Sequence, residues 1–172
     1  MHTTEELWQV SLHDPILTSV MRGIFPVVNI YPSALIANTD PHDQHGTHWI
    51  VMYFVTPDES EFFDSYGFPP ETYDTDEYVL RESTHFNDKP LQGLTSDLCG
   101  DYCLFYLLHS ARNVDLNIIQ AKFKRYDSQW NDAQVARFIH SYVQSITSVS
   151  TRFQREEQAC KSLQCWRKQS IK

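Results

Sequence analysis

No run of apolar residues in this 172-residue sequence approaches the roughly 18 that a membrane-spanning helix needs. The longest clear run is Ile50–Val55. Near the start, Glu5 and Glu6 stand where a secretory signal has positive charge followed by an apolar stretch. The four cysteines are too few for a scaffold built on disulfides. We therefore expect an intracellular protein in a reducing compartment, without membrane contact.

Basic residues are scarce in the first part of the chain and common in the last part. Residues 1–110 contain 3 Lys or Arg and 17 Asp or Glu, a net charge of −14, whereas residues 111–172 contain 11 and 5, a net charge of +6. Two differently charged faces of one domain would explain this pattern, and so would a basic end that binds nucleic acid. The length is that of one ordinary domain and there is no internal repeat, so we expect a single domain over residues 1–150. A basic, Gln-rich tail follows over 151–172, with a loosely packed helix as one form that it could take.

Two apolar segments have the composition of β-strands. Ser33–Asn38 is one, and Trp49–Val55, which is nearly all apolar and rich in β-formers, is predicted to be a buried central strand. After a short turn, the chain returns in a further strand at Glu61–Asp64. An antiparallel hairpin of the last two strands would bring His48 close to Asp64, because side chains at such neighbouring positions are about 5–7 Å apart.

Leu98–Ser110 is the strongest predicted helix, and it has so little polar face that we expect it to be central and buried. The other predicted helices are a short one that opens at Thr3, one from Asp14 to Gly23, an acidic one over 71–82, and two that follow the N-cap candidates Asp115 and Asn131, over roughly 116–124 and 132–146. Three or four strands follow one another instead of alternating with helices. The predicted fold class is therefore α+β, with a small mixed β-sheet flanked by helices and a central buried helix.

Cys99 stands in the first turn of the predicted buried helix. A helix N-terminus stabilises an anion, and a nearby histidine cation lowers the pKa of a thiol below its free value of about 8.5. Cys99 and His48 would then form the thiolate–imidazolium pair of a cysteine hydrolase, with Asp64 holding the imidazole. The N–H of Cys99 and the side-chain amide of Gln92 would bind the developing oxyanion. Taken singly, each of these residues is more often structural.

The local sequence around these residues resembles the adenovirus endopeptidase family, adenain, which belongs to the clan of the SUMO- and ubiquitin-like-protein proteases. Three segments carry the resemblance: Gly46–Val51, Phe62–Phe68 and Leu91–Cys103. As in that clan, the order is histidine, acidic residue, glutamine and cysteine, with Trp49 directly after the histidine and six residues between the glutamine and the cysteine. The resemblance covers about residues 24–110 and is compatible with a viral or a Maverick/Polinton transposon origin.

The resemblance implies a papain-like or adenain-like fold with the nucleophile at the start of the central helix. It assigns the catalytic roles as follows: Cys99 is the nucleophile, His48 the general base and acid, Asp64 the residue that orients the histidine, and Gln92 the oxyanion donor. The residues expected at the substrate are Trp49 beside the histidine, and Gly93 and Gly100, where the backbone can come close to a bound peptide. Family members cut after glycine, so the resemblance implies a cysteine endopeptidase that cleaves precursor proteins at Gly-containing sites.

Adenain is activated by DNA and by a short peptide that is disulfide-linked to a cysteine between the acidic residue and the nucleophile. No cysteine lies between Asp64 and Cys99 here, which argues against such a disulfide, whereas the basic C-terminal region suits DNA. We expect no required cofactor and leave activation by DNA or a short peptide open. The expected partners are protein substrates with Gly-containing cleavage sites and DNA at the basic region. We expect a monomer in the nucleus or the cytoplasm, or packaged in a virion.

Other functions stay open. A SUMO- or ubiquitin-like-protein isopeptidase would keep the fold and change the substrate, and a catalytically silent DNA- or protein-binding module would keep the fold without the chemistry. Acyl transfer to an acceptor other than water would use the same residues. The spacing of Cys99 with Cys103 and of Cys160 with Cys165 suits zinc, but a zinc site would consume the proposed nucleophile, so no metal site is expected.

Overall fold

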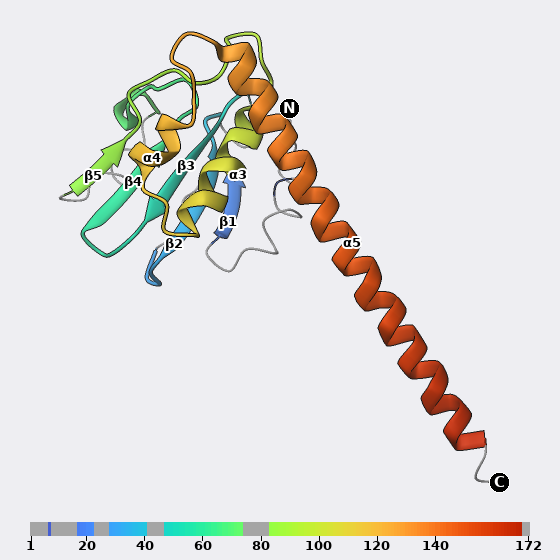
Figure 1. Ribbon diagram of the computed structural model, residues 1–172. Helices are drawn as coiled ribbons and strands as arrows, with labels where there is room; N and C mark the ends of the chain where they lie inside the picture. The colour runs from blue at the N-terminus through green and yellow to red at the C-terminus, as the bar shows by residue number, and fades with distance from the viewer. Residues whose placement is uncertain (1–6, 8–16, 23–27, 41–46, 74–82, 170–172) are drawn as a thin grey trace. The chain divides into compact units, whose positions relative to one another are not determined.

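The computed structural model describes residues 7, 17–22, 28–40, 47–73 and 83–169, with the backbone alone over 17–22 and 149–169 (Figure 1). The chain divides into two compact units, Met1–Ile139 and His140–Lys172. Residues of the predicted tail belong to the second unit, where the last helix continues as far as Gln169. None of the helices in the described residues is long and apolar enough to cross a membrane.

The described residues form a five-stranded sheet whose strands lie in sequence order (Figure 1). The strands are β1 (Leu17–Arg22), β2 (Ser33–Asn38), β3 (Trp49–Phe54), β4 (Glu59–Phe63) and β5 (Ser83–Phe86). The two outer pairs, β1 with β2 and β4 with β5, are parallel, and the two inner pairs are antiparallel. The prediction of an α+β fold with a small mixed sheet is therefore confirmed.

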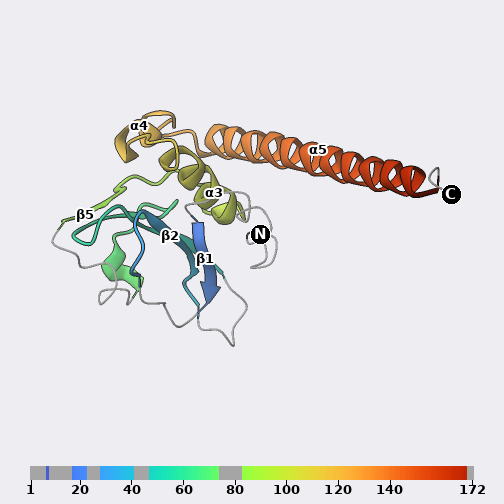
Figure 2. The same cartoon turned by 90° about the horizontal axis from the view of Figure 1, so that it is seen from below.

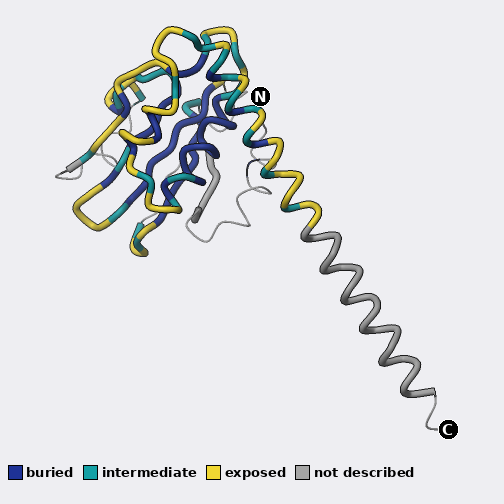
Figure 3. Tube along the Cα trace, in the orientation of Figure 1, coloured by how far each residue is buried: buried dark blue, intermediate teal, exposed yellow. Residues whose placement is uncertain are grey.

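The strands β2 and β3 lie at the centre of the sheet and supply much of the core. All residues of both strands are buried (Figure 3), in agreement with their nearly unbroken apolar sequences. The two strands pair from Ser33 opposite Phe54 to Asn38 opposite Trp49. Apolar side chains from three strands form one core cluster: Leu35, Ala37, Ile50, Met52, Phe54 and Phe62. Both predicted strands are confirmed. Their pairing also fixes the position of residue 48, which directly precedes β3.

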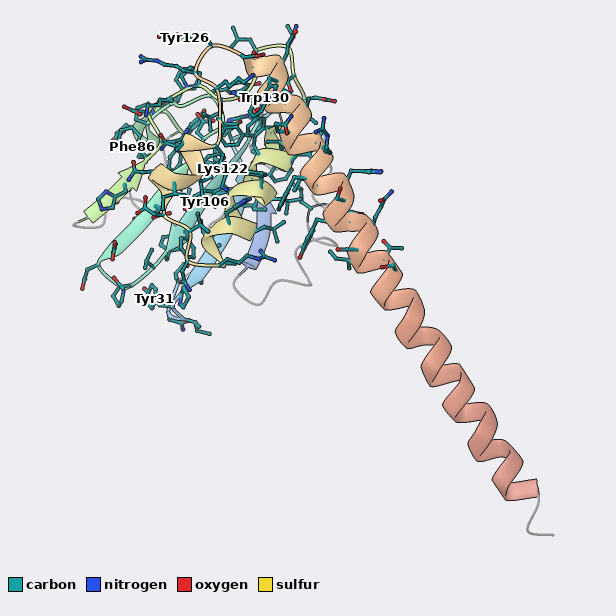
Figure 4. The ribbon with its side chains drawn as sticks, in the orientation of Figure 1. Tyr31, Phe86, Tyr106, Lys122, Tyr126 and Trp130 are labelled. Carbon is teal, nitrogen blue, oxygen red and sulfur yellow. The ribbon has the colours of Figure 1, made fainter. Side chains whose placement is uncertain are left out.

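Helix α3 (Cys99–Ser110) lies on one face of the sheet and packs against β3 (Figure 2). Every residue of this helix except His109 is buried. The prediction of a central buried helix with Cys99 at its N-terminus is therefore confirmed. Tyr106 of α3, which Figure 4 labels, stacks on Phe63 of β4 with ring centroids 4.7 Å apart. Truncation of this buried ring to alanine would lower the free energy of unfolding by about 3–5 kcal/mol.

Helix α4 (Leu116–Ala121) follows α3 after a short connection. Its predicted N-cap is confirmed, because the Asp115 side chain accepts a hydrogen bond of 2.7 Å from the Asn117 N–H. Beyond α4, the ring of Phe123 packs on Phe105 of α3 with centroids 5.3 Å apart. The segment after α4 is thus attached to the central helix.

Helix α5 (Ser128–Gln169) begins earlier than the sequence predicted. Its first turn is capped by Asp127, whose side chain accepts a 3.0 Å hydrogen bond from the Trp130 N–H. The predicted N-cap, Asn131, lies inside the helix. Its Oδ1 atom accepts the Lys124 N–H at 2.8 Å, and its Nδ2 atom donates to the Lys124 carbonyl at 2.9 Å. The side chain therefore binds the segment before α5 and does not cap the helix.

The segment Leu17–Arg22 differs from the sequence prediction, which placed a helix from Asp14 to Gly23. The segment is strand β1 and pairs in parallel with β2 along most of its length. Its Thr, Ser and Val residues have weak helix propensity, and an unpaired sheet edge offers them backbone hydrogen bonds. Tertiary pairing therefore outweighed the local helix-start signal.

The strand β5 was not predicted, because its four residues show no clear strand pattern. It pairs in parallel with β4. The described part of the predicted acidic helix over 71–82 belongs to a 3₁₀ turn, Pro70–Tyr73. The rest of that prediction lies outside the described residues, as does the helix predicted to open at Thr3.

Candidate active site

The hairpin of β3 and β4 brings His48 and Asp64 together. His48 directly precedes β3 and Asp64 directly follows β4, and the strands pair with Val51 opposite Phe63. The His48 Nε2 atom lies 2.6 Å from Asp64 Oδ1, and both residues are buried. The predicted proximity is therefore confirmed. With a protonated imidazole this is a charge-assisted hydrogen bond, which is the stronger kind.

The Asp64 carboxylate accepts four hydrogen bonds. Oδ1 accepts from His48 Nε2 and from the Tyr66 N–H at 2.9 Å. Oδ2 accepts from the Phe68 N–H and from the Tyr73 hydroxyl, both at 2.9 Å. A buried carboxylate needs such donors, and here they orient both oxygens. As a result, Oδ1 has a fixed direction toward the imidazole.

Two residues hold the turn that follows Asp64. The buried Asn87 donates from Nδ2 to the Asp64 carbonyl at 2.6 Å and accepts the Asp64 N–H at 2.9 Å. Gly67 donates its N–H to the same carbonyl and has a φ of 75°, which glycine adopts without strain. A Cβ at Gly67 would lie 2.5 Å from the carbonyl carbon of Lys89. The turn therefore packs too closely on the segment after β5 for any other residue.

The His48 imidazole is oriented by contacts on its edge and on its face. Besides the bond through Nε2, its ring stacks on Tyr66 with centroids 4.5 Å apart and an interplanar angle of 26°. Burial by itself lowers the pKa of His48, but the hydrogen bond to Asp64 and the interaction with Cys99 outweigh burial and raise the pKa to about 9. Nδ1 has no hydrogen-bond partner among the described residues and is the ring atom left to exchange a proton. Because its pKa is about 9, the imidazole is a cation at neutral pH.

Cys99 is the first residue of α3 and is 1% exposed. The N-cap residue, Leu98, provides no side-chain hydrogen bond to the first turn of this helix. Cys99 contributes to the raised pKa of His48 and, after burial, to the raised pKa of Tyr66, so its charge acts on both side chains. One turn further on, burial raises the pKa of Cys103 well above that of an ordinary thiol. Cys103 therefore stays protonated, which leaves Cys99 as the nucleophile candidate.

Gln92 is buried in the segment that precedes α3. Its Oε1 atom accepts a hydrogen bond from the Ser65 hydroxyl at 2.6 Å, and its Nε2 atom donates to the Ser96 carbonyl at 2.8 Å. Nε2 carries a second hydrogen, which is the one that an oxyanion would use. Ser65 directly follows Asp64, so the connection from Gln92 to the His48–Asp64 pair runs through this serine.

The three residues predicted at the substrate differ in their exposure. Trp49 is 0% exposed, and its side chain belongs to the core. The expected substrate contact at Trp49 stays a prediction. Gly100 is buried in the first turn of α3. Gly93 is half-buried, and a Cβ there would meet side-chain atoms of Asp132 and Ser128 at 3.2 and 3.4 Å.

Sequence reasoning missed three residues that support this arrangement: Ser65, Tyr73 and Asn87. The only signal for Ser65 is its place beside Asp64 in a turn sequence, Asp-Ser-Tyr-Gly. Tyr73 and Asn87 lie 9 and 23 residues after Asp64. No local pattern links a residue to a partner at such a separation. These supports could be found only in the folded chain.

Among the described residues, no group of three or more His, Cys, Asp or Glu side chains could hold a metal ion. No protein-family model matches the chain, and no curated protein is significantly similar to it. Two solved structures that resemble the chain are crystal structures of the ASFV pS273R protease. One matches with a TM-score of 0.38 and 21% identity over 60% of this chain and 41% of the protease. The other, of the Se-Met protein, matches with a TM-score of 0.37 and 19% identity over 57% and 42%. The chain thus spans less than half the length of the protease that it matches.

Proposed function

We propose that the chain is a cysteine endopeptidase in which Cys99 is the nucleophile, His48 the base and acid, and Asp64 the residue that orients the histidine. The observation that supports this most directly is the buried 2.6 Å hydrogen bond between His48 Nε2 and Asp64 Oδ1, beside a cysteine at the start of a helix. A histidine held through Nε2 can present Nδ1 to the sulfur. Its raised pKa keeps it protonated beside a thiolate, which is the activated form of such a nucleophile.

In the first half-reaction, the Cys99 thiolate attacks the carbonyl carbon of the scissile peptide bond. The carbonyl electron pair moves to the oxygen, and the N–H of Cys99 and the second Nε2 hydrogen of Gln92 donate to this oxyanion. When the oxyanion collapses, the carbon–nitrogen bond breaks and the proton on His48 Nδ1 passes to the leaving amine. The products of this step are a free amine, a neutral imidazole and a thioester on Cys99.

In the second half-reaction, His48 Nδ1 accepts a proton from a water molecule whose oxygen forms a bond to the acyl carbon. The carbon–sulfur bond breaks, the carboxylic acid leaves, and the thiolate–imidazolium pair is restored. Asp64 keeps its hydrogen bond to Nε2 through both steps. It thereby stabilises the imidazolium form each time the ring gains a proton.

For the substrate, we propose precursor proteins with Gly-containing cleavage sites. The resemblance of the local sequence to adenain supports this choice, and so does the access to the sulfur. Cys99 is 1% exposed, and the ring of Tyr66 covers one face of His48 beside it. A peptide carbonyl has to approach the sulfur closely, and a glycine meets the least steric hindrance in doing so.

The first test is alkylation of the cysteines with iodoacetamide across a range of pH, with mass spectrometry to identify the labelled residue. Cys99 should react quickly well below pH 8 in the wild type and lose this reactivity in His48→Ala. His140→Ala is the control variant, because His140 is exposed and lies in the second unit. Slow labelling of Cys99 in all three proteins, with and without added DNA, would contradict the thiolate–imidazolium pair.

The second test is cleavage of Gly-X-Gly peptides. The wild type should cleave them, and Cys99→Ala should lose about 10³-fold or more of kcat. Equal cleavage by the two proteins would show that another group is the nucleophile. A ubiquitin-like probe that ends in two glycines separates the alternative substrate class. Labelling of Cys99 by this probe would favour a SUMO- or ubiquitin-like-protein isopeptidase.

A further inference from the structure

Ser65 makes three hydrogen bonds to the segment that carries Gln92. Its carbonyl oxygen accepts the N–H groups of Leu91 at 2.9 Å and of Gln92 at 3.0 Å, and its hydroxyl donates to Gln92 Oε1 at 2.6 Å. Ser65 is 0% exposed and directly follows Asp64, whose carboxylate holds His48. This one residue joins the turn that orients the histidine to the segment of the oxyanion donor.

The two ends of the Gln92 amide have partners of different chemistry. The Ser96 carbonyl oxygen can only accept, so it requires the Nε2 end at its 2.8 Å contact. The Ser65 hydroxyl donates to the Oε1 end and restrains the amide from turning. Because Ser96 uses one of the two Nε2 hydrogens, the rotation of the amide about its Cγ–Cδ bond decides where the other hydrogen points.

The backbone of this segment is held without the Ser65 hydroxyl. The Leu91 carbonyl accepts hydrogen bonds from the Tyr102 hydroxyl at 3.1 Å and from Asn131 Nδ2 at 3.0 Å. The two bonds to the Ser65 carbonyl involve only main-chain atoms, so they remain in any variant at that position. Removal of the hydroxyl should therefore release the Gln92 amide and leave the path of the chain unchanged.

We propose that Ser65 is a positioning residue for the oxyanion step. Its hydroxyl directs the second Nε2 hydrogen of Gln92 toward the oxygen on which negative charge develops. The proposal rests on the proposed function, in which Gln92 is an oxyanion donor. The turn after β4 then supports both parts of the chemistry: its Asp64 orients the base, and its Ser65 orients the group that stabilises the transition state.

The kinetic test is the Ser65→Ala variant. Removal of a whole oxyanion-hole donor lowers kcat by about 10²–10³, so loss of its orientation alone should lower kcat by about tenfold, with KM unchanged. The rate of Cys99 alkylation should stay at the wild-type value, because His48 and Asp64 are untouched. In a Gln92→Ala background, Ser65→Ala should cause no further loss, since its effect acts through that amide.

Ser60→Ala is the matched control. Ser60 is 1% exposed, and its hydroxyl pairs at 3.0 Å with that of Thr84 within the sheet. It should retain the wild-type kcat although it also loses a buried serine hydroxyl. Equal losses in Ser60→Ala and Ser65→Ala would overturn the proposal. So would a loss from Ser65→Ala that is the same with and without Gln92.

A second readout does not depend on turnover. The heteronuclear NOE of the Gln92 side-chain amide, assigned with Gln92→Ala, should show a rigid group in the wild type and in Ser60→Ala, and a mobile group in Ser65→Ala. Equal rigidity in all three proteins would overturn the proposal even if the wild type cleaves peptides. If instead the wild type cleaves no peptide and only Ser65→Ala has a mobile amide, the positioning of Gln92 is supported and the proposed function is contradicted.

Discussion

Replacement of Asp64 by asparagine tests the electrostatics of the site with little change in shape. The native carboxylate accepts two hydrogen bonds at each oxygen, from His48 and the Tyr66 N–H at one and from the Phe68 N–H and Tyr73 at the other. Whichever way the new amide turns, its NH₂ group meets a backbone N–H, which can only donate. The variant therefore loses the negative charge beside His48 and one accepting atom.

The expected magnitude follows from the pKa of His48. Its rise from 6.5 to about 9 corresponds to about 3 kcal/mol in favour of the imidazolium form. The hydrogen bond to Asp64 is the largest of the raising effects, and burial, which lowers the pKa, remains in the variant. We therefore expect the imidazole of Asp64→Asn to be neutral at pH 7.5. If this whole stabilisation were lost from the transition state, kcat/KM would fall by about 10²-fold.

The assay is the pH dependence of Cys99 alkylation in Asp64→Asn. At pH 6.5 the wild type should be labelled faster than the variant, because only the wild type keeps a cation beside the thiol. Asp58→Asn is the control, because Asp58 is exposed in the turn of the same hairpin. Labelling of Asp64→Asn at pH 6.5 at the wild-type rate would refute the reasoning. So would an NMR titration that still finds the pKa of His48 near 9 in the variant.

Three further outcomes are expected. Because the folded-state pKa of His48, about 9, exceeds the unfolded value of 6.5, the stability that this residue contributes is complete below pH 6.5 and is lost as pH rises through 9. In urea unfolding, the difference between the wild type and His48→Ala should accordingly shrink from pH 6 to pH 9.5, and a constant difference would contradict this. Gly67→Ala should lower the free energy of unfolding by about 3 kcal/mol, because alanine would adopt a positive φ and its Cβ would lie 2.5 Å from Lys89. An unchanged urea midpoint would show that the turn can relax. We also propose that the basic C-terminal region binds DNA. The wild type should then raise the fluorescence anisotropy of labelled DNA in a salt-dependent way, and the double variant Arg152→Glu with Arg155→Glu should bind more weakly. Absent or salt-independent binding would exclude this role.

The central elements of the fold could be predicted because their local patterns allow little choice. Ser33–Asn38 and Trp49–Phe54 are short apolar runs rich in β-formers, and Cys99–Ser110 is an apolar segment of helical length. Consecutive strands joined by a short turn pair antiparallel, so the approach of His48 to Asp64 also followed from the sequence.

Segments with weak or competing signals could not be assigned in this way. Leu17–Arg22 follows a good helix-start signal but is a strand, and the short Ser83–Phe86 has no pattern of its own. Both lie at an edge of the sheet, where a neighbouring strand supplies backbone hydrogen bonds. Asn131 has the residue type of an N-cap, but its side chain spans to Leu91 and Lys124. In each case a partner that is distant in the sequence outweighed the local preference.

The order and spacing of residues were enough to predict the chemical groups of the candidate site: a thiol at a helix start, an imidazole before one strand and a carboxylate after the next. Only the tertiary structure decided how these groups are held. Tyr73 and Asn87 form hydrogen bonds to Asp64, and Ser65 forms one to Gln92. Local propensity arises from neighbours along the chain. A hydrogen bond between segments depends on the distance that packing leaves between them, and in this protein that distance is set by the hairpin and the central helix.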